Sequence, residues 1–268
     1  MTSHLKRWLT AIIAVPLLFA VVYAGSDALF SAMIILIILV GVYEYHQIAF
    51  GAGHLREKAQ GMAIGLMIPV TVYFGDMQML LAVLSFAVLF VFFVYLMRIK
   101  EDHFDIRPVA KLVLGFMYVP LMMSYFILIR RLDQGVLWIF FLLVLAFSGD
   151  VTAYYVGKNI GKKKLLPHVS PNKTVEGTIG LIIGSTAGCV IFKAIFFPAL
   201  PVVHAAALGF FGGILGQLGD LCESAMKRSS GVKDSGMILP GHGGILDRLD
   251  CLIFIAPFVY YYYIFIIK

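Results

Sequence analysis

Four aspartates lie near the ends of apolar stretches in the C-terminal half of the chain. Asp150 follows VLAFSG, Asp220 follows GGILGQLG, and Asp247 and Asp250 lie three residues apart at the start of the last apolar stretch. This spacing puts two side chains on one face of a helix. Carboxylates near lipid are costly unless a cation compensates them, and their oxygens are the ligands that Mg²⁺ prefers. We therefore predict that Asp220, Asp247 and Asp250 hold Mg²⁺, with Asp150 supporting them or binding a second cation.

Basic residues accompany these acids in two polar segments, 157–176 and 223–244. In the second segment, PGHGG at 240–244 leads into a predicted helix, and a helix N-terminus attracts anions through its free N–H groups. Lys173 likewise precedes a helix N-terminus, a poor place for a cation unless an anion joins it. We predict that the two segments, together with Arg248 shortly after the second, bind phosphate groups through Ser170, Asn172, Lys173, Lys227, Arg228, Lys233, His242 and Arg248.

Simpler roles are open for the same residues. The aspartates can form ion pairs with Arg248, Arg228 or Lys227 that neutralise the carboxylates and have no role in catalysis. Glycines also form ordinary turns, and Ser170 and Asn172 can serve as helix caps. The three cysteines, Cys189, Cys222 and Cys251, are widely spaced and indicate neither a disulfide framework nor a zinc site.

The composition predicts the elements that position these residues. The chain is 61% hydrophobic and 13% charged, whereas a soluble domain carries about a quarter charged residues. We expect an all-α polytopic membrane protein that forms a single domain over residues 1–268. In it, helices of residues 1–135 face lipid and give support, and residues 136–268 carry the active site.

A membrane-spanning helix needs about 20 apolar residues. Nine such spans are expected, at 8–24, 28–49, 59–75, 77–98, 109–129, 136–156, 175–197, 204–222 and 245–267.

The basic residues also indicate an orientation. With a cytoplasmic N-terminus, all but four of the 21 lysines and arginines fall on the inner side, as the positive-inside rule requires. The active site is then expected at the cytoplasmic end of the helices. The net charge of +6 comes from basic residues that flank apolar spans. This placement indicates membrane topology and does not indicate nucleic-acid binding. The first 25 residues also have features of a signal peptide, but the span directly after them favours a first membrane helix.

The region around the last acids resembles a known family. SAMKRSSGVKDSGMILPGHGGILDRLD is similar to the signature of the phosphatidate cytidylyltransferases, or CDP-diacylglycerol synthases. The elements Ser-x-x-Lys-Arg, Lys-Asp, Pro-Gly-His-Gly-Gly and Asp-Arg-x-Asp occur in order from Ser224 to Asp250. SGDVTAYYVGKNIGKKKL and SPNKTVEGTIGL resemble upstream blocks of the family, with a mild departure at Val151. The resemblance covers most of residues 145–255.

The resemblance implies that CTP and phosphatidate react to give CDP-diacylglycerol and pyrophosphate. Asp220, Lys227, Asp247 and Asp250 are then the expected catalytic residues, with Mg²⁺ as the cofactor. Phosphatidate would enter sideways from the bilayer, so that membrane lipids surround the site. The family also implies a homodimer, and a short chain without an N-terminal extension is typical of the bacterial inner membrane.

Two other functions fit parts of the pattern. A CTP-dependent lipid kinase would share the nucleotide but transfer its γ-phosphate. A cation-coupled transporter would also carry acids within the membrane, but near the midplane and in paired halves with broken helices. The four aspartates instead lie beside basic segments, and the sequence shows no repeated halves.

Overall fold

The structure, a computed structural model, describes residues 3–99, 105–236, 238 and 243–268. Most of the described residues are helical, which confirms the all-α part of the predicted fold class. The one sheet found among them is a short hairpin of two antiparallel strands, β1 (Lys164–Leu166) and β2 (Ser170–Thr174). No strand was predicted from the sequence in this segment. The chain forms two compact units, one of residues 1–128 and 234–247, the other of residues 129–233 and 248–268.

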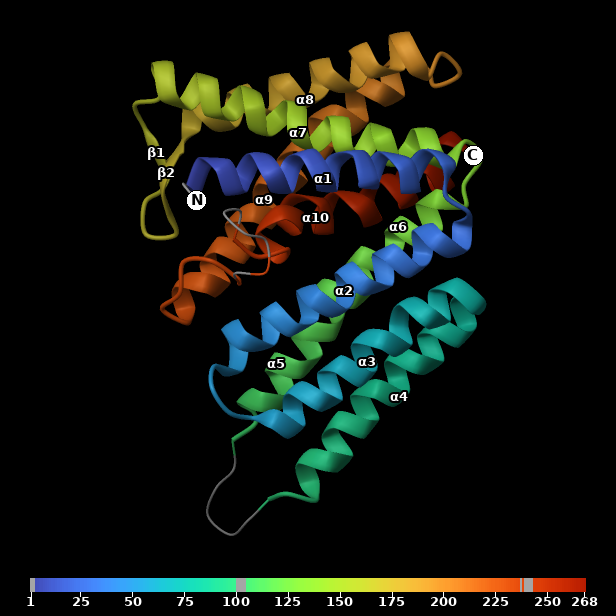
Figure 1. The fold of residues 1–268 in the computed structure, drawn as a ribbon, viewed down its shortest axis with the longest axis vertical. Coiled ribbons are helices and arrows are strands. Elements are labelled where there is room, and N and C mark those ends of the chain that lie inside the picture. The colour runs from blue at the N-terminus through green and yellow to red at the C-terminus, as the bar shows by residue number, and fades with distance from the viewer. Residues whose placement is uncertain (1–2, 100–104, 237, 239–242) are drawn as a thin grey trace. The chain divides into compact units, whose positions relative to one another are not determined.

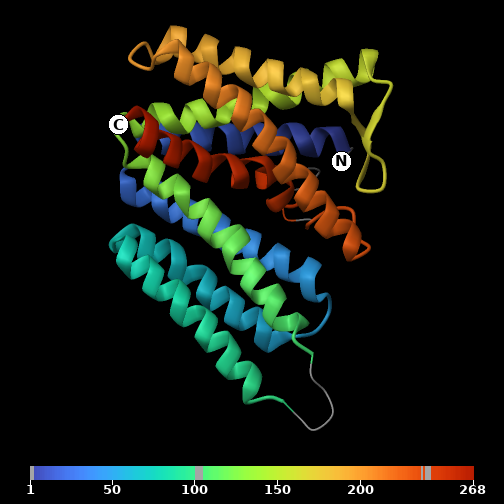
Figure 2. The same cartoon turned by 180° about the vertical axis from the view of Figure 1, so that it is seen from behind.

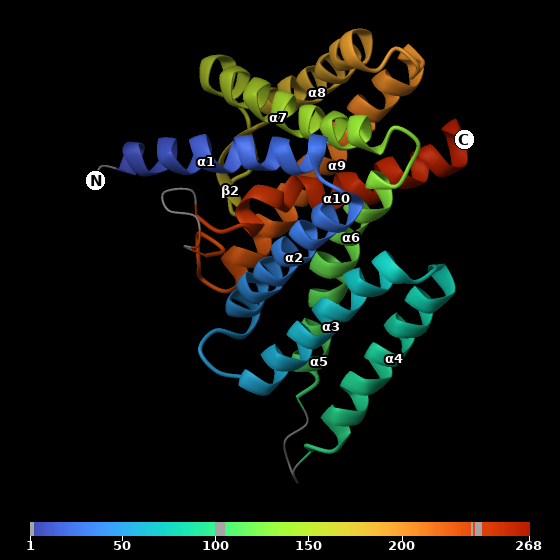
Figure 3. The ribbon, with the colours of Figure 1, turned by 45° about the vertical axis from the view of Figure 1, so that its right-hand side comes forward.

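The first unit is built from the N-terminal helices. They are α1 (Ser3–Ala24), α2 (Asp27–Phe50), α3 (Leu55–Phe74), α4 (Met77–Leu96), α5 (Arg107–Phe116), the π-helical turn η1 (Met117–Leu121) and the start of α6 (Met122–Arg130). Figure 3 shows α3 and α4 as antiparallel neighbours. The turn between them contains Asp76, whose side chain accepts a hydrogen bond of 2.8 Å from the backbone N–H of Met79. This cap begins α4, and it explains why one long apolar run becomes two helices.

The core of the first unit lies between α2, α3 and the α5–η1 segment. Ile38 and Ile68 are fully buried there, and Phe116 and Val119 are almost so. Pro120 has no N–H to donate, and the π-helical turn is where the helix accommodates it. The helix continues through this turn, so that residues 107–130 form one apolar rod.

The second unit is built around three long helices. It contains α7 (Gly135–Ile160), the hairpin, α8 (Val175–Phe196), α9 (Val202–Ser229), most of α10 (Leu246–Tyr262) and the π-helical end η2 (Tyr263–Ile267). Figure 1 shows α7 and α8 side by side, with the hairpin at one end of the pair. Small residues permit this close packing: a Cβ at Gly184 would collide with Thr152, and one at Gly188 with Ser148.

The hairpin and the polar end of α9 lie on the same side of the second unit. Figure 2 shows α9 running from the turn after α8 towards the end where the hairpin lies. Contacts between β2 and α9 agree with this view. The two segments that the sequence analysis marked as phosphate-binding therefore begin from one end of this unit.

The membrane character of the chain is confirmed by its helices. Among the described residues, seven helices are long and apolar enough to cross a membrane: Asp27–Phe50, Met77–Leu96, Arg107–Arg130, Gly135–Ile160, Val175–Phe196, Val202–Ser229 and Leu246–Ile267. Of the other two expected spans, α3 begins with Arg56, Glu57 and Lys58, which lowers its hydropathy. In α1 the short apolar stretch is Val15–Ala24.

Candidate active site

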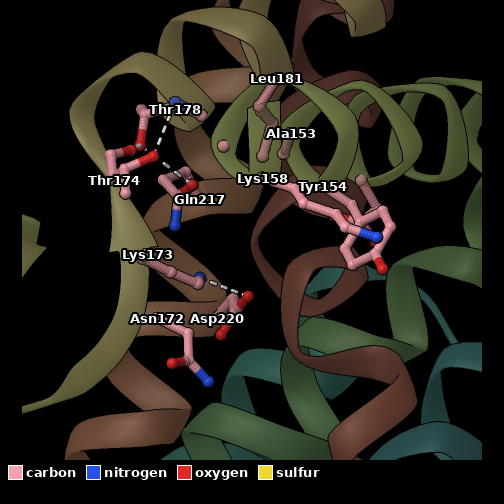
Figure 4. Close-up of a pocket in the computed structure, with 13 residues that line it drawn as sticks. Ala153, Tyr154, Lys158, Asn172, Lys173, Thr174, Thr178, Leu181, Gln217 and Asp220 are labelled. Carbon is pink, nitrogen blue, oxygen red and sulfur yellow. Dashed lines mark hydrogen bonds and ion pairs between the residues drawn. The ribbon is translucent and has the colours of Figure 1, made fainter. Parts of the chain in front are cut away.

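A cavity of about 480 Å³ lies in the second unit, between α7, the hairpin, α8 and α9. Its volume falls in the range of ligand pockets, roughly 300–1,000 Å³. Figure 4 shows side chains from all four elements around it. The polar ones are Asp150, Lys158, Asn172, Lys173, Thr174, Thr178, Gln217 and Asp220, and Ala153, Tyr154 and Leu181 supply apolar surface.

The hairpin is fixed to the start of α8 by side-chain caps. The hydroxyl of Thr174 accepts a hydrogen bond of 3.1 Å from the backbone N–H of Gly177, which makes Thr174 the N-cap. The carboxylate of Glu176 accepts from the backbone N–H groups of Lys162 at 3.0 Å and Lys163 at 3.2 Å. Because these bonds fix both strands to the helix, Lys173 at the end of β2 is held over the cavity.

Lys173 forms an ion pair with Asp220 of α9, and both side chains line the cavity (Figure 4). The sequence analysis expected that a cation at this position needs an anion. In the structure that anion is a carboxylate of the protein itself. The hydroxyl of Ser224, one turn further along α9, donates a hydrogen bond of 3.3 Å to the same carboxylate. Asp220 is therefore compensated by two polar partners, one of them positively charged.

Two more aspartates lie close enough to interact with this pair. The carboxylates of Asp150 in α7 and Asp250 in α10 both interact electrostatically with Asp220 and with Lys173. Arg248, whose side chain is exposed, interacts with Asp150. The structure thus brings three of the four singled-out acids together from three helices.

A close contact between α9 and α10 brings Asp250 near Asp220. A Cβ at Gly219 would collide with the carbonyl oxygen of Asp250 and would lie 3.2 Å from the ring of Phe254. A Cβ at Gly216, one turn earlier, would lie 3.0 Å from Ile255. Glycine at these two positions lets the helices approach, and the acids on either side of the contact come together as a result.

The carboxylates suit Mg²⁺ chemically, because every ligand they offer is an oxygen. Among the described residues, however, no group of three or more acidic, histidine or cysteine side chains is already set to hold a metal ion. The cation paired with Asp220 in this structure is the ammonium group of Lys173. A metal at these residues remains a prediction.

Asp247, the fourth aspartate, belongs to the first unit and fixes the loop before α10. One of its carboxylate oxygens accepts hydrogen bonds from the backbone N–H groups of Ser235 at 3.0 Å and Gly244 at 2.9 Å. Its own N–H donates to the hydroxyl of Ser235 at 3.3 Å. Asp247 therefore closes the loop between Ser235 and Gly244 and begins the helix.

Glu44 in α2, which sequence analysis missed, completes this arrangement within the first unit. It is 1% exposed, and its carboxylate accepts from the backbone N–H groups of Ile245 at 3.0 Å and Leu246 at 2.8 Å and from the hydroxyl of Ser235 at 3.0 Å. In this structure the N–H groups at this helix N-terminus have acceptors within the protein, and phosphate binding by the preceding segment stays a prediction. The N–H groups of residues 244–247 all bond to side chains of the protein. The signal that could have marked Glu44 is the presence of an acidic residue within an apolar span.

The remaining predicted residues of α9 have partners outside the cavity lining. The ammonium of Lys227 pairs with Glu223, whose side chain is fully buried one turn earlier. The side chain of Arg228 donates a hydrogen bond of 3.3 Å to the carbonyl oxygen of Val169 in the hairpin turn. Each of these cations thus has a structural contact that the sequence did not reveal.

The other predicted phosphate-binding residues differ in their placement. Asn172 lines the cavity beside Lys173, whereas Ser170 lies on β2 opposite Leu166 and is not among the lining residues. Lys233 is exposed after the end of α9. His242 lies outside the described residues, so its predicted role is neither supported nor opposed.

Three cavity residues that sequence reasoning did not assign come from the helices. Lys158 lies 5.6 Å from the centroid of the Tyr154 ring, a cation–π geometry. Gln217 lies one helical turn before Asp220 on α9 and is buried, with its side chain towards the cavity. A buried amide in an apolar helix was the signal that could have marked it.

The same chain matches a family model of the cytidylyltransferase family over residues 5–266. The chain belongs to the cytidylyltransferase family. A phosphatidate cytidylyltransferase of Bacillus subtilis is 46% identical over 162 residues, which are 60% of this chain and 60% of the relative. Proteins of the same name from Synechocystis and Staphylococcus epidermidis are 32% and 33% identical. These two alignments cover 96% and 94% of this chain and 95% of each relative.

The contact between α9 and α10 in this member of the family can be tested by Gly219→Ala. The added methyl group overlaps the carbonyl oxygen of Asp250, so we expect the free energy of unfolding to fall by about 1–3 kcal/mol. Denaturant titration of the purified protein in detergent measures the change. Leu218→Ala, at an exposed neighbouring position, is the control and should change stability little. An unchanged stability in Gly219→Ala would contradict the close contact.

The Glu44 anchor can be tested by Glu44→Gln. Because an amide nitrogen cannot accept the bonds that the second carboxylate oxygen accepts, we expect a loss of about 1–3 kcal/mol of stability and faster amide exchange at residues 244–247. Hydrogen–deuterium exchange with mass spectrometry measures the second effect. Gln47→Ala, on the same helix but exposed, is the control. Exchange as slow as in the unsubstituted protein would count against the anchor.

Proposed function

We propose that this protein is a phosphatidate cytidylyltransferase, which converts CTP and phosphatidate into CDP-diacylglycerol and pyrophosphate. The observation that carries the proposal is a cavity lined by Lys173, Asp220 and Asp150, with Asp250 close enough to interact electrostatically with all three. Such a site offers a positive group that can bind phosphate and carboxylates that can bind a metal ion. A nucleotidyl transfer between two phosphate-bearing substrates requires both. Family membership and the names of the full-length relatives support the same reaction.

The proposed setting is the inner membrane of a bacterium. We propose nine membrane spans, a cytoplasmic N-terminus and an active site at the cytoplasmic face, as the distribution of basic residues supports. CTP would then arrive from the cytosol and phosphatidate from the inner leaflet. A homodimer is proposed as well, on the family resemblance alone.

The proposed reaction is a nucleotidyl transfer. A phosphate oxygen of phosphatidate forms a bond to the α-phosphorus of CTP, and the bond from that phosphorus to the oxygen bridging to the β-phosphate breaks. Because the attacking phosphate is already anionic at neutral pH, the site needs no strong base and no activated serine. The obstacle is repulsion between two anions, so catalysis consists of positioning and of charge compensation.

The residues of this chain divide that task. Lys173, with Asn172 beside it, would bind a phosphate group in the cavity. Arg248, near Asp150, would extend the positive charge on the second unit. Lys227, Arg228 and Lys233 remain candidates for the triphosphate and the departing pyrophosphate. Ser170 and His242 are further candidates for substrate contacts.

The aspartates are proposed to hold Mg²⁺. Asp220 and Asp250 are the first candidates, because their carboxylates interact in this structure, with Asp150 beside them. Asp247 is the third ligand predicted from the sequence. When bound, Mg²⁺ would neutralise phosphate charge and stabilise the negative charge that develops in the transition state. The carboxylate oxygens of Asp150 are candidate ligands for a second cation.

The lipid-kinase alternative predicts different products from the same nucleotide. Purified protein is incubated with CTP labelled in the cytidine moiety, phosphatidate and Mg²⁺, and lipid and water-soluble products are separated. We expect the label in a CDP-lipid and equimolar pyrophosphate. Label in CDP, with a newly phosphorylated lipid, would instead establish a kinase. A transporter would give no product at all.

The metal proposal predicts a selective loss of activity. Asp250→Asn keeps the size of the side chain but removes a charge, so we expect turnover to fall at least about a hundredfold while the protein remains folded and inserted in the membrane. Chelation of divalent cations should abolish activity in the unsubstituted protein, and added Mg²⁺ should restore it. Asp27→Asn, in the first turn of α2, is the control. Normal turnover of Asp250→Asn would remove this residue from the metal site.

A further inference from the structure

Gln217 presents an unused hydrogen-bond donor to the cavity. The residue is 6% exposed, and its amide nitrogen is covered from solvent and has no hydrogen-bond partner among the described residues. A buried donor without a partner costs free energy, so such a group is expected where a ligand supplies the acceptor. Figure 4 shows the amide nitrogen turned to the side of Lys173 and Asp220, away from Thr178.

The other end of the same amide is already engaged. The hydroxyl of Thr178 on α8 lies 3.4 Å from the carbonyl oxygen of Gln217 and 3.1 Å from the backbone carbonyl oxygen of Thr174, and it shares its one proton between them. This contact directs the amide nitrogen into the cavity. The N–H group of Gln217 therefore suits a ligand that offers an acceptor oxygen.

The position of Gln217 along α9 indicates which substrate carries that oxygen. It lies three residues before Asp220, about 4.5 Å further from the charged end of α9 that holds Lys227 and Arg228. Ala153 and Leu181 line the same cavity and are apolar. Phosphatidate has the same order of groups: the phosphate is followed by the glycerol backbone, then by the ester carbonyls, and then by the apolar acyl chains. A lipid whose phosphate lies at Lys173 would therefore place an ester carbonyl further towards the apolar side.

We infer that Gln217 donates a hydrogen bond to an acyl ester carbonyl of phosphatidate while the phosphate lies at Lys173. The inference rests on the proposed function and extends it, because it assigns the deeper end of the cavity to the lipid rather than to the nucleotide. Gln217 is then a residue that selects diacyl lipids over lipids without ester carbonyls.

The test compares two lipids in each of two enzymes. Diacyl phosphatidate and its dialkyl ether analogue, which lacks both carbonyls, are presented in identical detergent micelles at saturating CTP. The unsubstituted enzyme should prefer the diacyl lipid in kcat/KM by about fivefold, the factor expected for one neutral hydrogen bond. In Gln217→Met, which keeps the length of the side chain but removes the donor, the preference should fall to near unity. The KM for CTP should not change.

The measured preference does not depend on how much of the protein is folded. A partial loss of folded protein lowers the rates with the diacyl and the dialkyl lipid equally, so the ratio of the two rates stays the same. Gln217→Leu is read in the same way if Gln217→Met cannot be purified. Gln60→Met, in a different cavity of the first unit, is the matched control and should keep the fivefold preference. An equal preference in the unsubstituted enzyme and the Gln217 variants, or a changed KM for CTP alone, overturns the inference. Formation of no CDP-lipid from either lipid by the unsubstituted enzyme would instead overturn the proposed function, and the inference with it.

Discussion

Carboxylates inside apolar helices are the constraint on which this structure depends. An isolated charge in such surroundings is costly, and each acid must find a compensating group. Asp220 is compensated by Lys173, and the fully buried Glu223 by Lys227 on the same helix. Within the part of the chain that the structure describes, Glu44 is compensated by two backbone N–H groups and the hydroxyl of Ser235. The hairpin, the C-terminal turns of α9 and the start of α10 are each held in place by one of these contacts.

The packing of the second unit serves the same constraint. Glycines let α7 approach α8 and let α9 approach α10, and this brings acids from different helices within range of one another. Three carboxylates, with Lys173 and Arg248 as the cations that interact with them, leave negative charge in excess. That excess is unfavourable in the free protein, but it is the property that attracts a divalent cation. A bound cation would also let Lys173 leave Asp220, because Asp220 would no longer lack a positive partner.

The sequence predicted features that depend on local patterns. The apolar spans appear as helices at the expected positions, because hydrophobic runs of this length fold locally into helices. The need of Lys173 for an anion was also predictable, although the choice of Asp220 was not. The role of Glu44 was out of reach, since it joins residues about two hundred positions apart and requires the tertiary fold. The hairpin at 164–174 was missed because its strands are short and polar.

An exchange of partners explains how a single cluster can be stable without substrates and still act on them. In the free protein Lys173 and Asp220 satisfy each other, so neither charge is left alone next to the membrane. Under the proposed function, a substrate phosphate replaces Asp220 beside Lys173, and a cation replaces Lys173 beside Asp220. Lys173 and Asp220 each have a partner of opposite charge before and after the exchange, so the electrostatic cost of separating them stays small even though their interaction is strong. Nucleotidyl transfer suits such a site, because its nucleophile arrives already ionised and the protein has only to arrange charges around it.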